Sequence, residues 1–183
     1  MTLSVLLVAF QEPLQIEARS VMRSELPEPI PPQVFHEGFA LIEVQITNHR
    51  QEAWSFDPEE VVLRNPKGKI LKQAVGTDIA PRLVDYYRGG RPLYGAEAYG
   101  GSRIPRQTRL DSRSHPSQAG SSKVPATIGQ EIRDLFDSYR LQPSTLEAGE
   151  SVQGFLYVQS KHSGTRLRGG QVEFPDGLRA SIR

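Results

Sequence analysis

Apolar and polar residues alternate most clearly along residues 38–50, which read GFALIEVQITNHR. From Ile42 onward, apolar side chains are separated by Glu43, Gln45 and Thr47. A period of two places one set of side chains in a core and the other in water, as in a strand of an antiparallel sheet. We therefore predict a long strand here, with one buried and one solvated face and a turn at its last three residues.

Two hairpins are predicted from their turn residues. NPKG at residues 65–68 has proline at the second and glycine at the fourth position of a tight turn, between short runs at 61–64 and 69–72. Near the other end of the chain, PDG at residues 175–177 separates two further short runs. Each turn is expected to join two antiparallel strands.

The stretch STLEAGESVQGFLYV at residues 144–158 predicts a turn followed by a second long strand. Leu156 falls on one face of that strand, and Phe155 and Tyr157 fall on the other. A strand that is apolar on both faces is expected to be covered on both, here by the opposite sheet or by an insertion. Gly154 in its middle indicates a bulge or the close approach of another segment.

Helical spacing occurs twice. Residues 127–141 predict an amphipathic helix, with Thr127 as its N-cap. A shorter helical face is predicted near the start of the chain, formed by Leu14, Ala18, Val21 and Met22. The prolines that follow predict an extended connector; they are Pro27, Pro29, Pro31 and Pro32.

The apolar run at residues 3–10 has two interpretations. It reads LSVLLVAF, it lacks a preceding Lys or Arg, and no A-x-A cleavage site follows it. It is also shorter than the roughly 20 residues that cross a bilayer. We interpret it as a buried strand, with the tail of a clipped signal sequence as the alternative.

Short strands separated by turns are typical of an all-β fold. We predict an immunoglobulin-like antiparallel β-sandwich of about seven strands with one or two short helices. The length of 183 residues suits a single domain spanning 1–183. Within it, residues 85–125 are predicted to be a long basic insertion rich in Tyr, Gly and Arg.

The sequence offers little catalytic chemistry. The absence of cysteine excludes disulfides, thiol nucleophiles and cysteine-bound metals. There is no G-x-S-x-G nucleophile motif and no glycine loop placed to bind phosphate. The four histidines lack metal-binding spacing; they are His36, His49, His115 and His162. We predict no metal, no cofactor and no enzymatic activity, with an unrecognised hydrolase as an alternative.

Residues 85–123 combine basic and aromatic side chains. Seven Lys or Arg stand against three Asp or Glu, a net charge of +4, whereas the whole chain has a net charge of +1. A loop of this length in a compact domain is usually functional or disordered. We predict that its tyrosines and arginines bind a partner. The candidate binding residues are Tyr86, Tyr87, Arg88, Arg91, Tyr94, Tyr99, Arg103 and Arg106.

The composition of this segment leaves several partners open. Tyr and Arg are enriched at protein interfaces, so a protein or envelope component is the first candidate. Arginines interleaved with aromatic residues also suit nucleic acid, and they suit anionic glycans or lipids. A solvated loop that binds nothing is the remaining reading. The sequence does not define an oligomeric state.

Three motifs together resemble a family of bacterial cell-envelope proteins, many of them lipoproteins, that contain an immunoglobulin-like β-sandwich. The matching segments are Val44–Asn48, Leu63–Lys69 and Thr145–Tyr157. The resemblance implies a location in the cell envelope, periplasmic or secreted, and a role in binding or assembly, with a signal sequence missing from this chain. The long basic insertion departs from the family pattern, and without a lipobox cysteine a lipid anchor is not supported.

Overall fold

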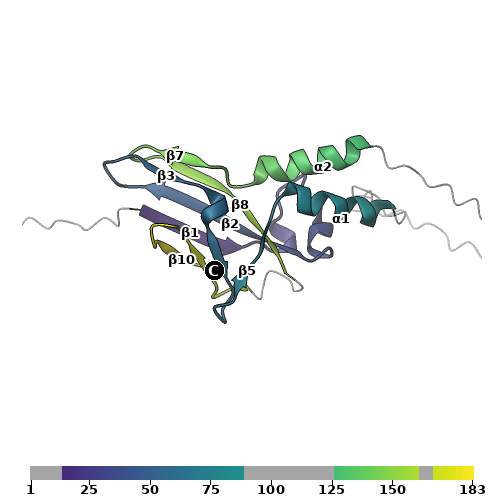
Figure 1. The fold of residues 1–183 in the computed structure, drawn as a ribbon, viewed down its shortest axis with the longest axis horizontal. Coiled ribbons are helices and arrows are strands. Elements are labelled where there is room, and N and C mark those ends of the chain that lie inside the picture. Colours follow the sequence, from purple (N-terminus) through teal and green to yellow (C-terminus); the bar gives the residue numbers. More distant parts are fainter. Residues whose placement is uncertain (1–13, 89–125, 161–166) are drawn as a thin grey trace, which may run out of the picture.

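The computed structural model describes residues 14–88, 126–160 and 167–183, which form antiparallel sheets and two helices (Figure 1). The strands are β1 (Leu14–Ser20), β2 (Phe39–Asn48), β3 (Trp54–Phe56), β4 (Val62–Arg64), β5 (Ile70–Leu71), β6 (Gln73–Ala74), β7 (Ser144–Leu146), β8 (Ser151–Gln159), β9 (Gln171–Glu173) and β10 (Arg179–Ser181). The helices are α1 (Gly76–Arg88) and α2 (Ala126–Tyr139). Short 3₁₀ turns lie at Arg23–Glu25, Pro32–Phe35 and Pro58–Glu60. This arrangement confirms the predicted β-rich, sandwich-like fold.

The first sheet has the strand order β1-β2-β8-β6, and every neighbouring pair is antiparallel. The two long predicted strands, β2 and β8, form its centre, where Ile42 pairs with Leu156 and Val44 with Gly154. Only glycine fits at position 154, because the backbone of Leu141 crosses the strand here. The Leu141 N–H donates to the carbonyl of Phe155 at 2.9 Å. The glycine therefore marks a close approach of two segments, as its position predicted.

A second sheet, with the order β10-β9-β4-β5, packs against one face of the first. Both predicted hairpins belong to it, since turns at residues 65–68 and 175–177 join β4 to β5 and β9 to β10. The two-stranded ribbon β3-β7 completes this core, where the ring of Trp54 stacks on that of Phe56 with the centroids 5.1 Å apart.

The two helices cover one end of the other face of the first sheet (Figure 1). Ile79 and Leu83 of α1 and Phe136 of α2 are fully buried against Phe39 and Tyr157 of the sheet. From Phe155 onward β8 is thus covered on both faces, one by the second sheet and the other by the helices. The predicted solvated face of β2 is correct only for its second half, because the helices bury the first half.

Two sequence expectations are wrong in this region. Residues 14–20 form a strand and not a helix, because their alternation of buried and exposed side chains matches that of β2, with which they pair. Residues 85–88 are the last turn of α1 and not part of a loop. Pro81 lies inside this helix, and proline in a sequence argues against a helix interior. The helical spacing of Ile79, Leu83 and Val84 is the signal that favours the helix.

Two other details differ or lie beyond the described residues. The predicted helix at 127–141 is confirmed as α2, but it begins at Ala126, so Thr127 is inside the first turn and is not the N-cap. The apolar run at 3–10 lies outside the described residues. No helix in the described part of the chain is long and apolar enough to cross a membrane.

Replacing Gly154 by alanine should destabilise the fold. A Cβ at this position would lie 2.5 Å from the Cα of Leu141 and 2.7 Å from its backbone nitrogen, so two backbone segments would have to separate. We expect a loss of about 1–3 kcal/mol in the free energy of unfolding, measured by urea denaturation. The matched control is Gly129→Ala in α2, where a Cβ meets only Val84 Cγ2 at 3.8 Å. That change should stabilise the protein by about 1 kcal/mol, and equal effects of the two changes would contradict this account.

Tyr157 should make the fold sensitive to high pH. Its hydroxyl donates to the carbonyl of Phe136 at 2.9 Å, and burial raises the pKa of Tyr157 above its ordinary value of 10.0. The unfolded chain therefore loses this proton first, and stability should fall as the pH rises above 10. Tyr157→Phe should lower the free energy of unfolding by about 1 kcal/mol at neutral pH. Above pH 10 the stability of this variant should fall less steeply than that of the unchanged protein. The free energy of unfolding of both proteins is measured by urea denaturation at several pH values. If it falls equally steeply with pH above 10 in both, the buried Tyr157 hydroxyl is not the cause.

Candidate functional site

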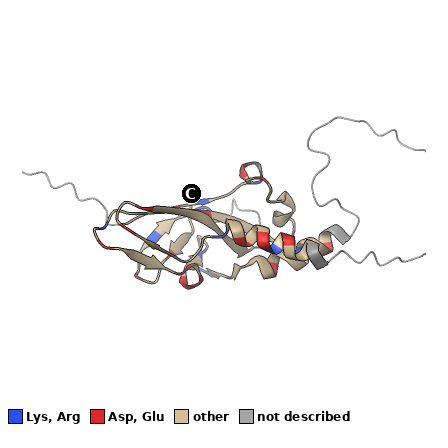
Figure 2. Ribbon diagram, turned by 90° about the horizontal axis from the view of Figure 1, so that it is seen from above, with Lys and Arg blue, Asp and Glu red and all other residues tan. Residues whose placement is uncertain are grey.

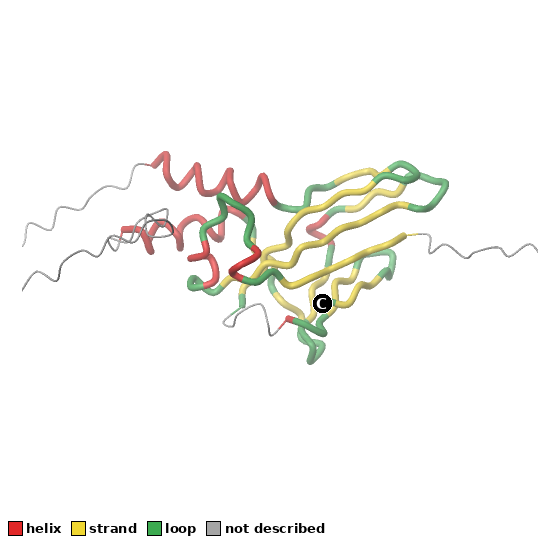
Figure 3. The backbone as a smooth tube through the Cα atoms, turned by 180° about the vertical axis from the view of Figure 1, so that it is seen from behind, coloured by secondary structure: helices red, strands yellow, loops and turns green. Residues whose placement is uncertain are grey.

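Helices α1 and α2 run antiparallel and side by side (Figures 1 and 3). The start of α1 meets the end of α2, where the N–H of Gly76 donates to Asp137 Oδ1 at 3.1 Å. A Cβ on Gly76 would lie 2.8 Å from the carbonyl oxygen of Arg133, so glycine permits this contact. Consequently the end of α1 at Arg88 and the start of α2 at Ala126 lie at the same end of the molecule.

The predicted binding residues fall on and beyond the last turn of α1. Tyr86 is half-buried and packs against the core beneath the helices. Tyr87 and Arg88 complete the helix. The other candidates lie outside the described residues; they are Arg91, Tyr94, Tyr99, Arg103 and Arg106. The structure therefore places the first three on a helix and leaves the others untested.

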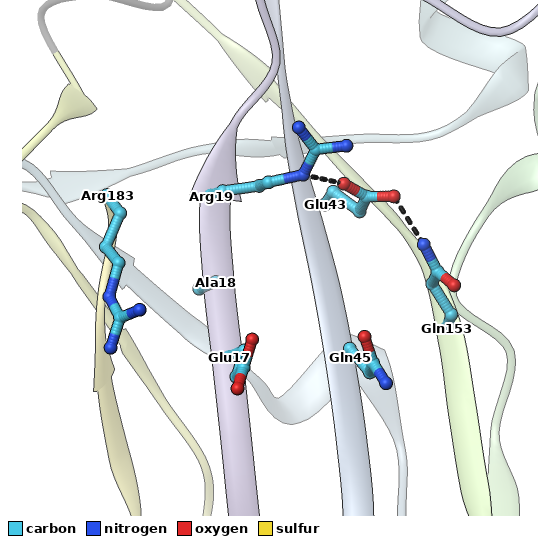
Figure 4. A pocket seen from close by; sticks show the side chains of 7 residues that line it. All are labelled: Glu17, Ala18, Arg19, Glu43, Gln45, Gln153 and Arg183. Carbon is cyan, nitrogen blue, oxygen red and sulfur yellow. Dashed lines mark hydrogen bonds and ion pairs between the residues drawn. The ribbon is translucent and has the colours of Figure 1, made fainter.

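A polar hollow of about 320 Å³ lies on the part of the first sheet that the helices leave open (Figure 4). Register explains its composition, because the side chains in line across β1, β2 and β8 share this face: Arg19 with Glu43, and Glu17 with Gln45 and Gln153. The remaining lining residues are Ala18 and Arg183.

Glu43 is the centre of the interactions in the hollow. Its carboxylate accepts a hydrogen bond from Arg19 Nε on one side and from Gln153 Nε2 on the other (Figure 4). Arg19 also lies 3.7 Å from Glu25 through its Nη1. Only 11% of the Glu43 side chain is exposed. The carboxylate is thus neutralised and held in place by its neighbours.

The other charged groups of the hollow have fewer contacts. Glu17 Oε1 accepts from Gln15 Nε2 at 2.8 Å. Arg183 is exposed, and its guanidinium has no hydrogen bond or ion pair among the described residues. Its backbone N–H donates to the carbonyl of Ala18 at 3.0 Å, which holds this residue beside β1.

The hollow has the chemistry of a polar binding surface. Its lining includes no histidine, and no group of three or more His, Cys, Asp or Glu in the described ranges could hold a metal ion. The sequence alone does not predict the hollow, because the spacing of Leu14, Ala18 and Val21 favours a helix where the structure has β1. The signal was present in the alternation of Gln15, Glu17 and Arg19 with apolar residues.

The chain matches no protein-family model and no curated protein. Among solved structures it is similar to the crystal structure of the yjhA protein from Bacillus subtilis. The sequence identity is 10%, the TM-score is 0.37, and the alignment covers 93% of this chain and 87% of that one. A likeness at this level assigns neither a family nor a function.

Glu43→Gln should destabilise the protein more than Glu17→Gln does. Glu43 accepts hydrogen bonds from Arg19 and Gln153, whereas Glu17 accepts a side-chain hydrogen bond only from Gln15 among the described residues, and that bond is exposed. We expect a difference of about 1 kcal/mol in the free energy of unfolding, measured by urea denaturation at neutral pH. If the two variants lose the same stability, Glu43 does not hold this face together.

Proposed function

We propose that this protein is a non-catalytic binding or scaffold module of the bacterial cell envelope that contacts a protein or another envelope component through residues 86–125. One observation carries the proposal: both boundaries of the basic, tyrosine-rich segment 89–125 lie at the same end of the α1–α2 pair. Whatever this segment binds is thereby connected to the sandwich through two helices.

The helices provide a firm base for such a contact. Ile79, Leu83 and Phe136 are completely buried, and the ring of Phe136 packs edge-on against Tyr157 of β8 with the centroids 5.3 Å apart. A binding segment fixed to a rigid support has less conformational freedom to lose on binding. This anchoring supports a role in recognition.

The side chains of the segment have suitable chemistry for recognition. Tyrosine offers a broad apolar ring with a polar tip, and arginine offers a planar set of donors for carboxylates or phosphates. Tyr86 has a different role from the others, because its ring already packs against the core of the protein. We therefore treat Tyr86 as an anchor and assign the direct contacts to the other candidates: Tyr87, Arg88, Arg91, Tyr94, Tyr99, Arg103 and Arg106.

The test is a photocrosslinking experiment on the full chain in envelope extracts of the source bacterium. A photoreactive amino acid at position 94 or 99 should give a discrete crosslinked product, and the same label at Arg50, in the turn after β2, should not. Replacing Tyr94, Tyr99, Arg103 and Arg106 together by serine should abolish capture of that product in a pull-down. The melting temperature should change by no more than a few degrees, because the substitutions leave the buried core of the described residues unchanged.

Other outcomes would redirect or end the proposal. Equal capture by the serine variant and the unchanged protein would exclude the segment as the contact site. Binding to nucleic acid that weakens steeply with added salt would identify the phosphate backbone as the target instead. Recovery of the full-length gene product only from the cytosolic fraction would exclude the envelope location.

A further inference from the structure

The charges of the described residues are divided between two parts of the molecule. Residues 62–72 and 167–183, which supply the second sheet, contain seven Lys or Arg and two Asp or Glu, a net charge of +5. The other described residues contain seven Lys or Arg and sixteen Asp or Glu, a net charge of −9. Figure 2 shows the acidic residues along the helices. The second sheet is therefore the cationic part of an otherwise acidic described structure.

The β4–β5 hairpin concentrates this positive charge. Lys67, Lys69 and Lys72 are exposed and have no hydrogen bond or ion pair through their ammonium groups among the described residues. Between them, Ile70 is 58% exposed, more than any other large apolar residue that the structure describes; Met22 follows at 39%. The hairpin thus presents one aliphatic side chain surrounded by three ammonium groups.

The hairpin is held in this shape by its own hydrogen bonds. Asn65 Oδ1 accepts from the N–H of Lys67 at 2.9 Å and from the N–H of Lys69 at 3.0 Å. The N–H of Gly68 donates to the Asn65 carbonyl at 2.8 Å, and Gly68 adopts a φ of 77° that favours glycine. Leu71 packs against the core between the sheets. Its inward direction fixes the outward direction of Ile70, because successive side chains of a strand alternate.

Neighbouring residues add positive charge and do not cancel it. Arg168 is exposed in a turn whose Gly169 lies close to Pro66 of the hairpin. Glu173, on the same sheet, already accepts from Arg64 Nε at 3.1 Å and Arg179 Nη2 at 2.7 Å, and these bonds hold the pKa of Glu173 below its ordinary value. The other acidic residue, Asp176, accepts from Trp54 Nε1 at 3.0 Å. Neither carboxylate is available to the hairpin lysines.

We propose that the β4–β5 hairpin docks onto an anionic lipid surface, with Ile70 entering the headgroup layer and Lys67, Lys69, Lys72 and Arg168 contacting lipid phosphates. The arrangement favours lipid over nucleic acid because an aliphatic side chain at the centre of the patch gains from an apolar layer and gains nothing from a phosphate backbone. Lysines with long flexible stems also suit a fluid layer of headgroups. The hairpin is a second contact surface, separate from the segment between the helices.

Vesicle flotation of the full chain tests the proposal. Binding to vesicles of phosphatidylcholine mixed with phosphatidylglycerol is expected, with little binding to phosphatidylcholine alone. Lys67→Gln with Lys69→Gln should weaken binding roughly twenty-five-fold, since each lysine near an anionic surface contributes about fivefold. The matched control removes two positive charges elsewhere, Arg23→Gln with Arg82→Gln, and should leave binding nearly unchanged because these exposed residues lie outside the second sheet.

A second measurement separates insertion from simple charge attraction. Ile70→Trp in a Trp54→Phe background should shift its fluorescence to the blue on anionic vesicles, and Ile70→Gln should weaken binding with every lysine in place. A tryptophan at position 70 that stays solvent-exposed on bound vesicles would overturn the proposal. It would also be overturned if the lysine and arginine pairs lost binding equally, or if only the removal of Arg103 and Arg106 abolished it. Tighter binding to duplex DNA than to vesicles would identify a different partner.

Discussion

The pairing of β2 with β8 is the interaction on which the rest of the structure depends. The two strands pair along their whole length, from Phe39 opposite Gln159 to Thr47 opposite Ser151. Both carry apolar side chains on each face, so the pair alone would expose two hydrophobic surfaces to water. Covering them requires a second sheet on one side and helices on the other, and the described structure supplies both.

The end of β2 is fixed by a buried polar residue. Asn48 is fully buried, and its Nδ2 donates to the carbonyls of Glu52 at 2.9 Å and Leu146 at 2.8 Å. Its Oδ1 accepts from the N–H of Arg50 at 2.9 Å. These bonds tie the first sheet to the turn leading into β3 and to strand β7. An apolar residue of similar size would leave two backbone carbonyls without these donors, which is costly inside a protein.

The sequence predicted the parts of the fold that depend on local chemistry. Turns with Pro and Gly located both hairpins, and alternation located β2. The double apolar face of β8 predicted cover on each side. Prediction from the sequence failed where contacts between distant residues decide the secondary structure. The spacing of residues 14–20 suits either a short helix or a strand, and pairing with β2 selects the strand.

The candidate sites depended even more on such contacts. Arg183 reaches the polar hollow only because the last strand lies next to β1, which no local pattern reveals. The tyrosines and arginines were identified from composition alone. The helical turn that carries Tyr86 could not be predicted from the sequence, because it depends on the packing of α1 against the first sheet. The cationic hairpin was visible in the sequence as a turn, but its exposed isoleucine became evident only with the sheet in place.

The antiparallel helix pair also has a consequence for how this protein can change over evolution. Contacts among α1, α2 and β8, all within the described residues, pack the two helices against each other and against the first sheet. Under ordinary loop-closure statistics, doubling the length of the segment that joins two such helices costs only about 0.6 kcal/mol. Insertions, deletions or wholesale replacement between Arg88 and Ala126 should therefore be tolerated, so that new binding specificities can arise on an unchanged framework.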